Sequence, residues 1–151
     1  MKLESKPLLP PGIHTMTINS VKELCVINRP NNTRRIILWE KFEQLISKIS
    51  EFGIVFTLWI DGSFTTEKET PGDIDLVCLF HASDFDKLTV DKQKEMTELL
   101  NTAKHNFSCD AYFTPHEHPI FPHYWLGFFT FDRNRNPKGL IEIIHGDVNE
   151  H

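Results

Sequence analysis

Two short apolar runs joined by a polar segment constrain the fold of this chain more than any other feature. The runs, residues 54–60 and 74–80, are rich in β-branched and aromatic residues and have the length of fully buried strands. The polar segment between them extends from Asp61 to Gly72. Buried strands need other elements to cover them, so this pattern predicts a sheet with helices packed against it.

Helical patterns surround the two runs. Apolar residues recur at helical spacing in each pattern. The longest pattern predicts a helix of about 17 residues by the 3.6-residue period, which includes Ile36 and Ile37 and ends at Gly53. This long helix is expected to cover one face of the sheet. The residues expected to cap the helices at their N-termini are Thr17, Thr33 and either Asp84 or Thr89.

The C-terminal half of the chain supplies further strand patterns. Residues 107–113 form a third run with strand character, and residues 124–131 are aromatic throughout and are compatible with a helix end or a strand. A turn-forming sequence separates residues 128–132 from residues 140–144. These two segments are therefore predicted to pair as a hairpin.

The N-terminus and the length of the chain complete the expected architecture. Several prolines followed by Gly12 predict an extended arm over residues 1–16, with no regular element before Thr15. The chain of 151 residues has room for one core. We therefore expect a single domain over residues 1–151, of the α/β (α+β) class, with a mixed central sheet and helices packed on it.

Charge and hydropathy argue against several classes of protein. The chain has 16 Lys and Arg against 21 Asp and Glu, whereas a protein that coats nucleic acid usually carries a strong basic excess. No apolar run approaches the ~20 residues of a membrane span and no secretory signal is visible, so we expect a cytosolic protein without membrane contact. The cysteines lack metal-binding spacing and are expected to be buried free thiols: Cys25, Cys78 and Cys109.

Carboxylates stand in this pattern where strands alone do not require charge. Asp73 and Asp75 are two residues apart at the start of the second run, so both side chains lie on one face of a strand. Asp110 interrupts the third run. Gly62 and Ser63 follow the first run and offer backbone N–H groups and a hydroxyl, with no Cβ at the glycine to hold a phosphate away.

This set of acidic residues favours a metal site. Carboxylates that face the same way repel each other, and a divalent cation removes that cost. Oxygen ligands favour Mg²⁺ or Mn²⁺, and Mg²⁺ fills its remaining positions with water and nucleotide phosphate. Asp73, Asp75 and Asp110 are therefore candidate ligands of two such ions. The alternative is a structural role, with Asp73 capping the loop and Asp75 paired to a nearby Lys or Arg.

At this point the sequence resembles a known family. Gly62-Ser63, the Asp73-Ile74-Asp75 triplet and the later Asp110 are similar to motifs of the nucleotidyltransferase superfamily, which includes DNA polymerase β and the minimal nucleotidyltransferases. The whole chain also resembles a small, poorly characterised bacterial branch of that superfamily. Its marks here are LPPGIH at 9–14, WIDGSF at 59–64, PGDIDLV at 71–77, GFF at 127–129 and PKG at 137–139.

The resemblance implies an activity and a role for each motif residue. An NMP would move from an NTP to a hydroxyl group of a protein, RNA or small-molecule acceptor, and pyrophosphate would leave. Gly62 and Ser63 would bind the triphosphate, and Asp73 and Asp75 would bind both metals. Asp110 would bind the catalytic metal and favour deprotonation of the acceptor hydroxyl. Apart from the resemblance, Lys68 lies in the loop between the two motif halves and is a further candidate phosphate contact.

Other functions stay open. A catalytically weak member would act as a regulatory module, one half of a toxin–antitoxin or phage-defence pair with a protein partner. A stand-alone RNA-binding protein is a third reading. Its candidate contacts to RNA or to a nucleotide, which are otherwise solvated surface charges, are Arg34, Arg35, Arg133, Arg135 and Lys138.

Two further clusters carry alternatives of their own. The histidine-rich loop offers zinc ligands, contacts to a base or phosphate, or solvated side chains at His116, Glu117, His118 and His123. The aromatic cluster of Trp125, Phe128, Phe129 and Phe131 could stack a nucleobase but is more typical of a core. Tyr112 is also assigned to the core.

Overall fold

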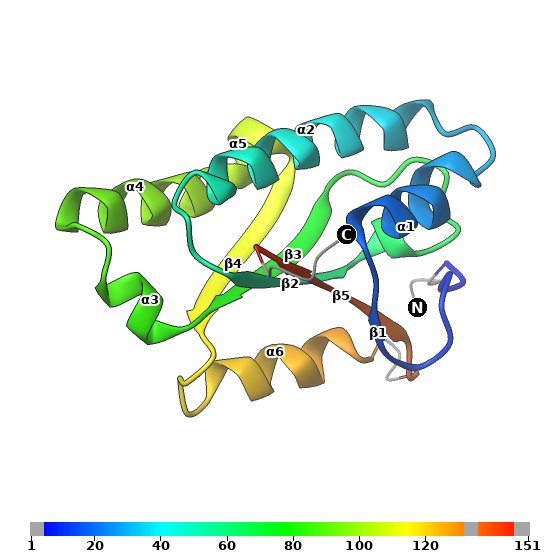
Figure 1. Ribbon diagram of the computed structural model, residues 1–151. Coiled ribbons are helices and arrows are strands. Elements are labelled where there is room, and N and C mark those ends of the chain that lie inside the picture. Colours follow the sequence, from blue (N-terminus) through cyan, green and yellow to red (C-terminus); the bar gives the residue numbers. More distant parts are fainter. Residues whose placement is uncertain (1–4, 132–135, 147–151) are drawn as a thin grey trace.

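The computed structural model describes residues 5–131 and 136–146, and it confirms a mixed sheet with helices packed against it (Figure 1). The sheet has five strands in the order β1-β5-β2-β3-β4. The strands are β1 (Gly12–Thr15), β2 (Phe56–Asp61), β3 (Ile74–Phe80), β4 (Cys109–Pro115) and β5 (Gly139–His145). The helices are α1 (Ile18–Lys22), the π-helical η1 (Glu23–Ile27), α2 (Thr33–Ser50), the 3₁₀ helix η2 (Ser63–Thr65), α3 (Ala82–Asp86), α4 (Val90–Asn101), α5 (Ala103–Phe107) and α6 (Phe121–Phe129). Within the described ranges, no helix has both the length and the hydrophobicity that crossing a membrane requires.

The three expected strands are present, with shifted ends. β3 coincides with the run 74–80, and β2 begins at Phe56 and includes Asp61. β4 begins at Cys109 because Phe107 belongs to α5 and Ser108 turns the chain with a left-handed φ of 52°. β2 and β3 pair antiparallel, whereas β3 and β4 pair parallel. A parallel pair needs a long crossover, which α3, α4 and α5 provide.

The hairpin predicted between residues 128–132 and 140–144 is wrong. The aromatic segment before the turn is helical, as α6. β5 instead lies between two other strands, antiparallel to β2 and parallel to β1, where both of its edges are paired, whereas an isolated hairpin pairs only one edge of each strand. One bridge joins Phe131 to Pro137, and Asp132 lies outside the described residues.

The N-terminal arm is extended, but a strand begins in it earlier than the prolines suggest. β1 pairs with β5 from Gly12 onward, so the expectation of no regular element before Thr15 is wrong. Upstream of β1, the N–H of Leu8 donates to the carbonyl of Thr65 at 3.0 Å. The arm is therefore fixed to the segment that follows β2, and residues 1–4 lie outside the described part.

The helix caps agree with the sequence in part. Thr17 accepts a hydrogen bond from the N–H of Ser20 at 3.1 Å, and Thr89 accepts one from the N–H of Lys92 at 3.2 Å, so both are confirmed as N-caps. Asp84, the other candidate, is not the N-cap of α4. It lies within α3, a one-turn helix that the pattern does not reveal.

Helix α2 is rotated relative to the expected stripe. Asn32 occupies the N-cap position and Thr33 is the first helical residue, so the cap assigned to Thr33 is wrong. Ile36 and Ile37 are each 42% exposed and do not face the core. The buried face has one polar member, Arg35, followed at helical spacing by Leu38, Trp39, Phe42, Leu45, Ile46 and Ile49.

The two faces of the sheet are covered unequally (Figure 1). The larger core lies between the sheet and α1, α2, α4 and α5. On the opposite face a smaller cluster joins Trp59, Val77, Leu79 and Leu140 to Phe129 of α6. Because α6 has only nine residues, it leaves part of that face uncovered.

The buried guanidinium of Arg35 organises the loop after β2. It donates hydrogen bonds to the backbone carbonyls of Cys25, Phe64, Thr66 and Lys68, at distances from 2.5 to 2.9 Å. The neighbouring Arg34 donates to the carbonyls of Pro71 and Gly72, at 3.2 and 2.7 Å. The two arginines therefore bind both ends of the loop that joins β2 to β3. They are structural anchors in this fold and not solvated surface charges.

We expect Arg35→Met to destabilise the protein by about 3 kcal/mol or more, because buried carbonyls lose their donors and methionine cannot replace them. The free energy of unfolding, measured by urea denaturation, checks this. Lys48→Met on the exposed side of the same helix is the matched control and should change stability by less than about 0.5 kcal/mol. Equal effects of the two substitutions would contradict the anchoring role.

Candidate metal centre

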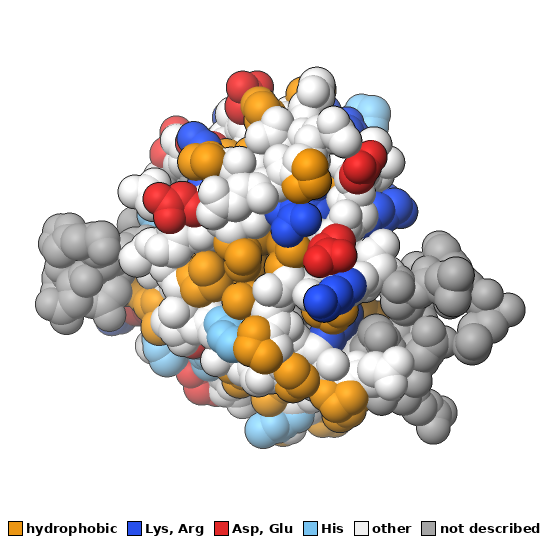
Figure 2. Space-filling model, turned by 90° about the vertical axis from the view of Figure 1, so that its right-hand side faces the viewer, with side chains coloured by type: hydrophobic (Ala, Val, Ile, Leu, Met, Phe, Trp, Pro, Cys, Tyr) orange, Lys and Arg blue, Asp and Glu red, His pale blue; other side chains and the backbone are white. Residues whose placement is uncertain are grey.

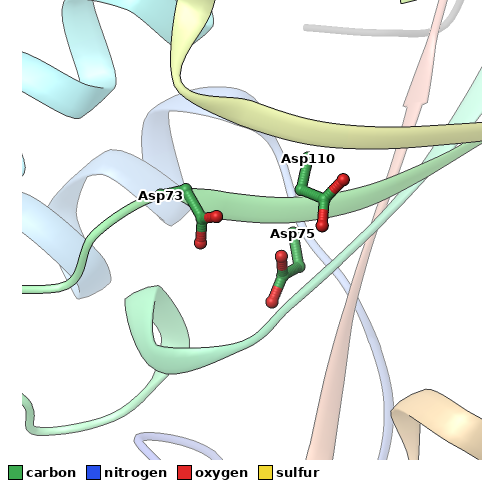
Figure 3. Close-up of side chains that lie close together, drawn as sticks. All are labelled: Asp73, Asp75 and Asp110. Atoms are coloured by element: carbon green, nitrogen blue, oxygen red, sulfur yellow. The ribbon is translucent and has the colours of Figure 1, made fainter. Parts of the chain in front are cut away.

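Asp73, Asp75 and Asp110 converge at one end of the sheet. Asp75 lies on β3 directly beside Asp110 on the parallel strand β4, and Asp73 precedes β3 by one residue. One carboxylate oxygen from each lies within 4.8 Å of the others. Figure 3 shows the three side chains pointing toward the same space. The structure therefore brings together the acidic residues that the sequence singled out.

Gly62 is required by the approach of Asp75. Its φ is 84°, a region that side chains rarely adopt, and a Cβ built there would lie 2.2 Å from Oδ2 of Asp75. Ser63 follows as the first residue of η2, and both residues line the cleft described below. The glycine-serine corner is thus in direct contact with the acidic cluster.

The electrostatics of the cluster are unfavourable for Asp75. Burial, together with the charges of Asp73, Asp110 and Asp61, raises the pKa of Asp75 to about 7, and Lys138 opposes the shift. The strand register accounts for the charges of Asp61 and Asp110, because it sets these two residues on either side of Asp75. Asp75 therefore tends to hold a proton in the folded protein unless another positive charge is close.

Asp61 and Lys138 belong to the same site, and the sequence does not reveal that they form an ion pair. Asp61 lies opposite Asp75 in the β2–β3 register and is 3% exposed. Its Oδ2 accepts from Nζ of Lys138 at 2.6 Å, which is a largely buried ion pair. The sequence does contain a signal for Asp61, because a charged residue ends an otherwise apolar strand. The same kind of signal, a charge within a strand pattern, singled out Asp110.

The acidic cluster opens into a cleft of about 770 Å³ on the α6 face of the sheet. This volume is within the range of small-ligand sites. Lys68 and Lys138 line it together with the glycine-serine corner, and Lys68 is exposed. Lysine side chains at the edge of an acidic site can contact an anionic ligand that the acids alone would repel.

The other wall of the cleft is aromatic, and this corrects part of the sequence interpretation. Tyr112 is 41% exposed and lines the cleft, so its assignment to the core is wrong. It lies two residues after Asp110 on the same strand, and residues at that spacing share a face. Phe129 is buried as expected, whereas Phe128 and Phe131 are exposed on the cleft.

Side chains of the histidine-rich loop, which the sequence offered as zinc ligands, form hydrogen bonds within the protein. Glu117 accepts from the ring of His81 and from the N–H of Ala82, and Nδ1 of His118 accepts N–H bonds at the start of α6. Among the described residues, the three acids are the group with metal-binding proximity. The zinc alternative therefore finds no support.

The cysteines and the remaining basic residues are the last candidates from the sequence. The cysteines are free and buried, and burial raises the pKa of each thiol to about 12, which keeps them protonated: Cys25, Cys78 and Cys109. Of the other basic residues that the sequence singled out, Lys138 lines the cleft. Arg133 and Arg135 lie outside the described residues.

Comparison with known proteins places the chain in a family. The model of that family matches residues 1–144. The chain belongs to DUF6932, a family of unknown function. No curated protein and no solved structure matches it. The DUF6932 match includes the three acids, the glycine-serine corner and Lys138.

The residues of this DUF6932 chain are suited to a hard divalent cation. Their carboxylate oxygens are the ligands that Mg²⁺ and Mn²⁺ prefer. Burial and the like charges of the neighbouring acids raise the pKa of Asp75 to about 7, and Lys138 compensates this only in part. A cation at Asp73, Asp75 and Asp110 would lower that pKa and would favour the ionised form of all three side chains.

Asp75→Asn should stabilise the metal-free protein, and more at pH 8 than at pH 5. The folded protein retains a proton on Asp75 that the unfolded chain, with a pKa near 3.9, releases, so this group destabilises the fold as the pH rises from about 4 to about 7. Because Asp75 is half-buried, we expect a gain of roughly 1–3 kcal/mol at pH 8 after allowance for solvent screening.

Thermal unfolding in a chelator, at several pH values, measures this gain. Asp86→Asn, which removes an exposed carboxylate on α3, is the control and should not change stability with this pH dependence. An Asp75→Asn variant whose advantage does not grow with pH would contradict a pKa of Asp75 raised by burial and by the neighbouring carboxylates.

Proposed function

We propose that this protein is a metal-dependent nucleotidyltransferase, which moves an NMP from an NTP to a hydroxyl group of a protein, RNA or small-molecule acceptor and releases pyrophosphate. The observation that carries the proposal is the convergence of Asp73, Asp75 and Asp110 within 4.8 Å beside Gly62. A phosphate ligand needs positive charge at such a site, which an ion and the nearby lysines would supply. The resemblance of the motifs to the nucleotidyltransferase superfamily supports the class of reaction.

The residues around the cluster have distinct roles in this proposal. Gly62 and Ser63 bind the triphosphate through backbone N–H groups and the serine hydroxyl, because the glycine allows close approach. Lys68, and Lys138 beside Asp61, place positive charge near the phosphates. These contacts hold the α-phosphorus in position for attack by the acceptor oxygen.

The acidic residues hold the metal and handle the proton. Asp73 and Asp75 would bind both ions, and Asp110 would bind one of them. When bound, Mg²⁺ or Mn²⁺ supplies positive charge that stabilises the attacking and leaving oxygens. Asp110 and Tyr112 lie two residues apart on β4 and both line the cleft. There Asp110 would favour loss of the proton from the acceptor hydroxyl as the new phosphorus–oxygen bond forms.

The charge distribution favours this activity over a general nucleic-acid coat. On the face that Figure 2 shows, basic side chains alternate with acidic and hydrophobic ones and form no continuous basic surface among the described residues. The net charge is −5. Binding that depends on neutralising many phosphates needs the opposite pattern.

A transfer assay tests the proposal. ATP, CTP, GTP and UTP labelled at the α-phosphate are incubated with the protein, Mg²⁺ or Mn²⁺, and cell extract as the source of acceptor. We expect covalent label on at least one extract component, and a loss of roughly 100-fold or more in Asp73→Asn and Asp110→Asn, because stabilisation of developing charge is removed. Chelator should abolish the label.

Asp86→Asn is the matched control for these variants and should transfer label as the unmodified protein does. No label with any nucleotide, or transfer that survives Asp110→Asn, would refute the transferase. Nucleotide binding that needs no metal and leads to no transfer would instead support the regulatory module of a toxin–antitoxin or phage-defence pair. Salt-sensitive RNA binding that survives both substitutions would support the RNA-binding alternative.

A further inference from the structure

Helix α6 carries an unusual stripe of aromatic side chains. Its members recur at helical spacing on one face and are Phe121, Tyr124, Trp125, Phe128 and Phe129. Such a face is normally buried against a sheet, yet among these rings Phe129 is the fully buried one. Tyr124 is 55% exposed and Phe128 is 60% exposed.

The exposed rings lie on the same cleft as the acidic cluster. Tyr124, Trp125 and Phe128 line it, and Tyr112 of β4 joins them with its ring centre 4.3 Å from that of Trp125. The rings of Tyr124 and Phe128 are nearly parallel, with an interplanar angle of 18°. Between them Gly127 also lines the cleft, and a side chain there would meet nothing within 4 Å. The wall is therefore aromatic, open and free of a covering segment among the described residues.

The two parts of the cleft are chemically different and close together. Tyr112 follows Asp110 by two residues on the same face of β4, a separation of about 7 Å along the strand. Asp75, Asp110 and Tyr112 all line the same cleft, so the aromatic wall adjoins the acids directly. A ligand that fills both parts needs an anionic, metal-binding end and a flat apolar end.

We propose that this aromatic wall, formed by Tyr112, Tyr124, Trp125 and Phe128, is the binding site for the nucleobase of an NTP whose phosphates lie at the acidic cluster. The inference rests on the proposed function and adds the mode of base recognition to it. Charge complementarity fixes the direction of the ligand, since the lysines and the metal site are at the acidic end. The volume of about 770 Å³ accommodates a nucleotide.

Recognition by such a wall has a consequence for selectivity. Stacking on aromatic side chains tolerates every base, because every base has a π-face. The wall therefore favours ligands that carry a nucleobase but discriminates only weakly among the four bases. We expect ATP, GTP, CTP and UTP to bind within a factor of about 10 of one another, with purines the tighter pair because they stack over a larger area.

Affinities of ATP and tripolyphosphate, each measured calorimetrically with Mn²⁺ on the full chain, test the inference. ATP should bind roughly 10-fold or more tighter than tripolyphosphate. Phe128→Ala and Tyr124→Ala should reduce that ratio several-fold and leave the tripolyphosphate affinity unchanged, which also shows that the variants are folded. Phe121→Ala is the matched control, because Phe121 is an exposed ring on the same helix that packs on His118 and does not line the cleft.

A measurement on the unmodified protein keeps the test independent of the variants. Trp125 lines the cleft, whereas Trp39 and Trp59 are buried, so ATP should quench tryptophan fluorescence and tripolyphosphate should not. Equal affinity for ATP and tripolyphosphate, without quenching, would overturn the nucleobase site and leave the metal and phosphate site intact. Failure of both ligands to bind would overturn the transferase together with the nucleobase site.

Discussion

Mutual repulsion among carboxylates, held side by side by the strand register, governs the site. β3 lies between β2 and β4, and the pairing sets Asp75 beside Asp61 on one strand and beside Asp110 on the other. Lys138 compensates Asp61 directly, with 2.6 Å between Nζ and Oδ2. Burial, together with the charges of the other acids, raises the pKa of Asp75 to about 7. Packing does not require this charge, so a ligand of opposite charge is the simplest physical reason for it.

The rest of the fold maintains this arrangement. Arg35 and Arg34 fix the loop between β2 and β3 by donating hydrogen bonds to its carbonyls. Gly62 leaves space for the carboxylate of Asp75, which a Cβ at that position would collide with. The larger core stabilises the sheet from the face that α1, α2, α4 and α5 cover. On the other face, α6 and the smaller cluster cover part of the sheet, and the described residues beside them form a cleft lined by acidic and aromatic side chains. Figure 3 shows the three acids of this cleft.

The sequence predicts the parts of this structure that depend on local patterns. Periodicity identified β2 and β3, and misplaced charge identified Asp73, Asp75 and Asp110, because a strand has a fixed alternation and tolerates few carboxylates. Pairing between distant segments was not predictable in the same way: β5 joins β1 and β2 across the chain, and Asp61 meets Lys138 only after that pairing. Arg35 was missed as an anchor because its partners are backbone carbonyls, which every sequence contains.

Direct titration with Mn²⁺, followed by electron paramagnetic resonance at pH 8, tests the central claim about these acids. We expect saturable binding that weakens about 10-fold or more in Asp75→Asn and in Asp110→Asn, since each removes a ligand oxygen charge, with Asp86→Asn unchanged. Absence of saturable binding, or equal affinity in all the variants, would contradict the assignment of Asp73, Asp75 and Asp110 as a shared metal site.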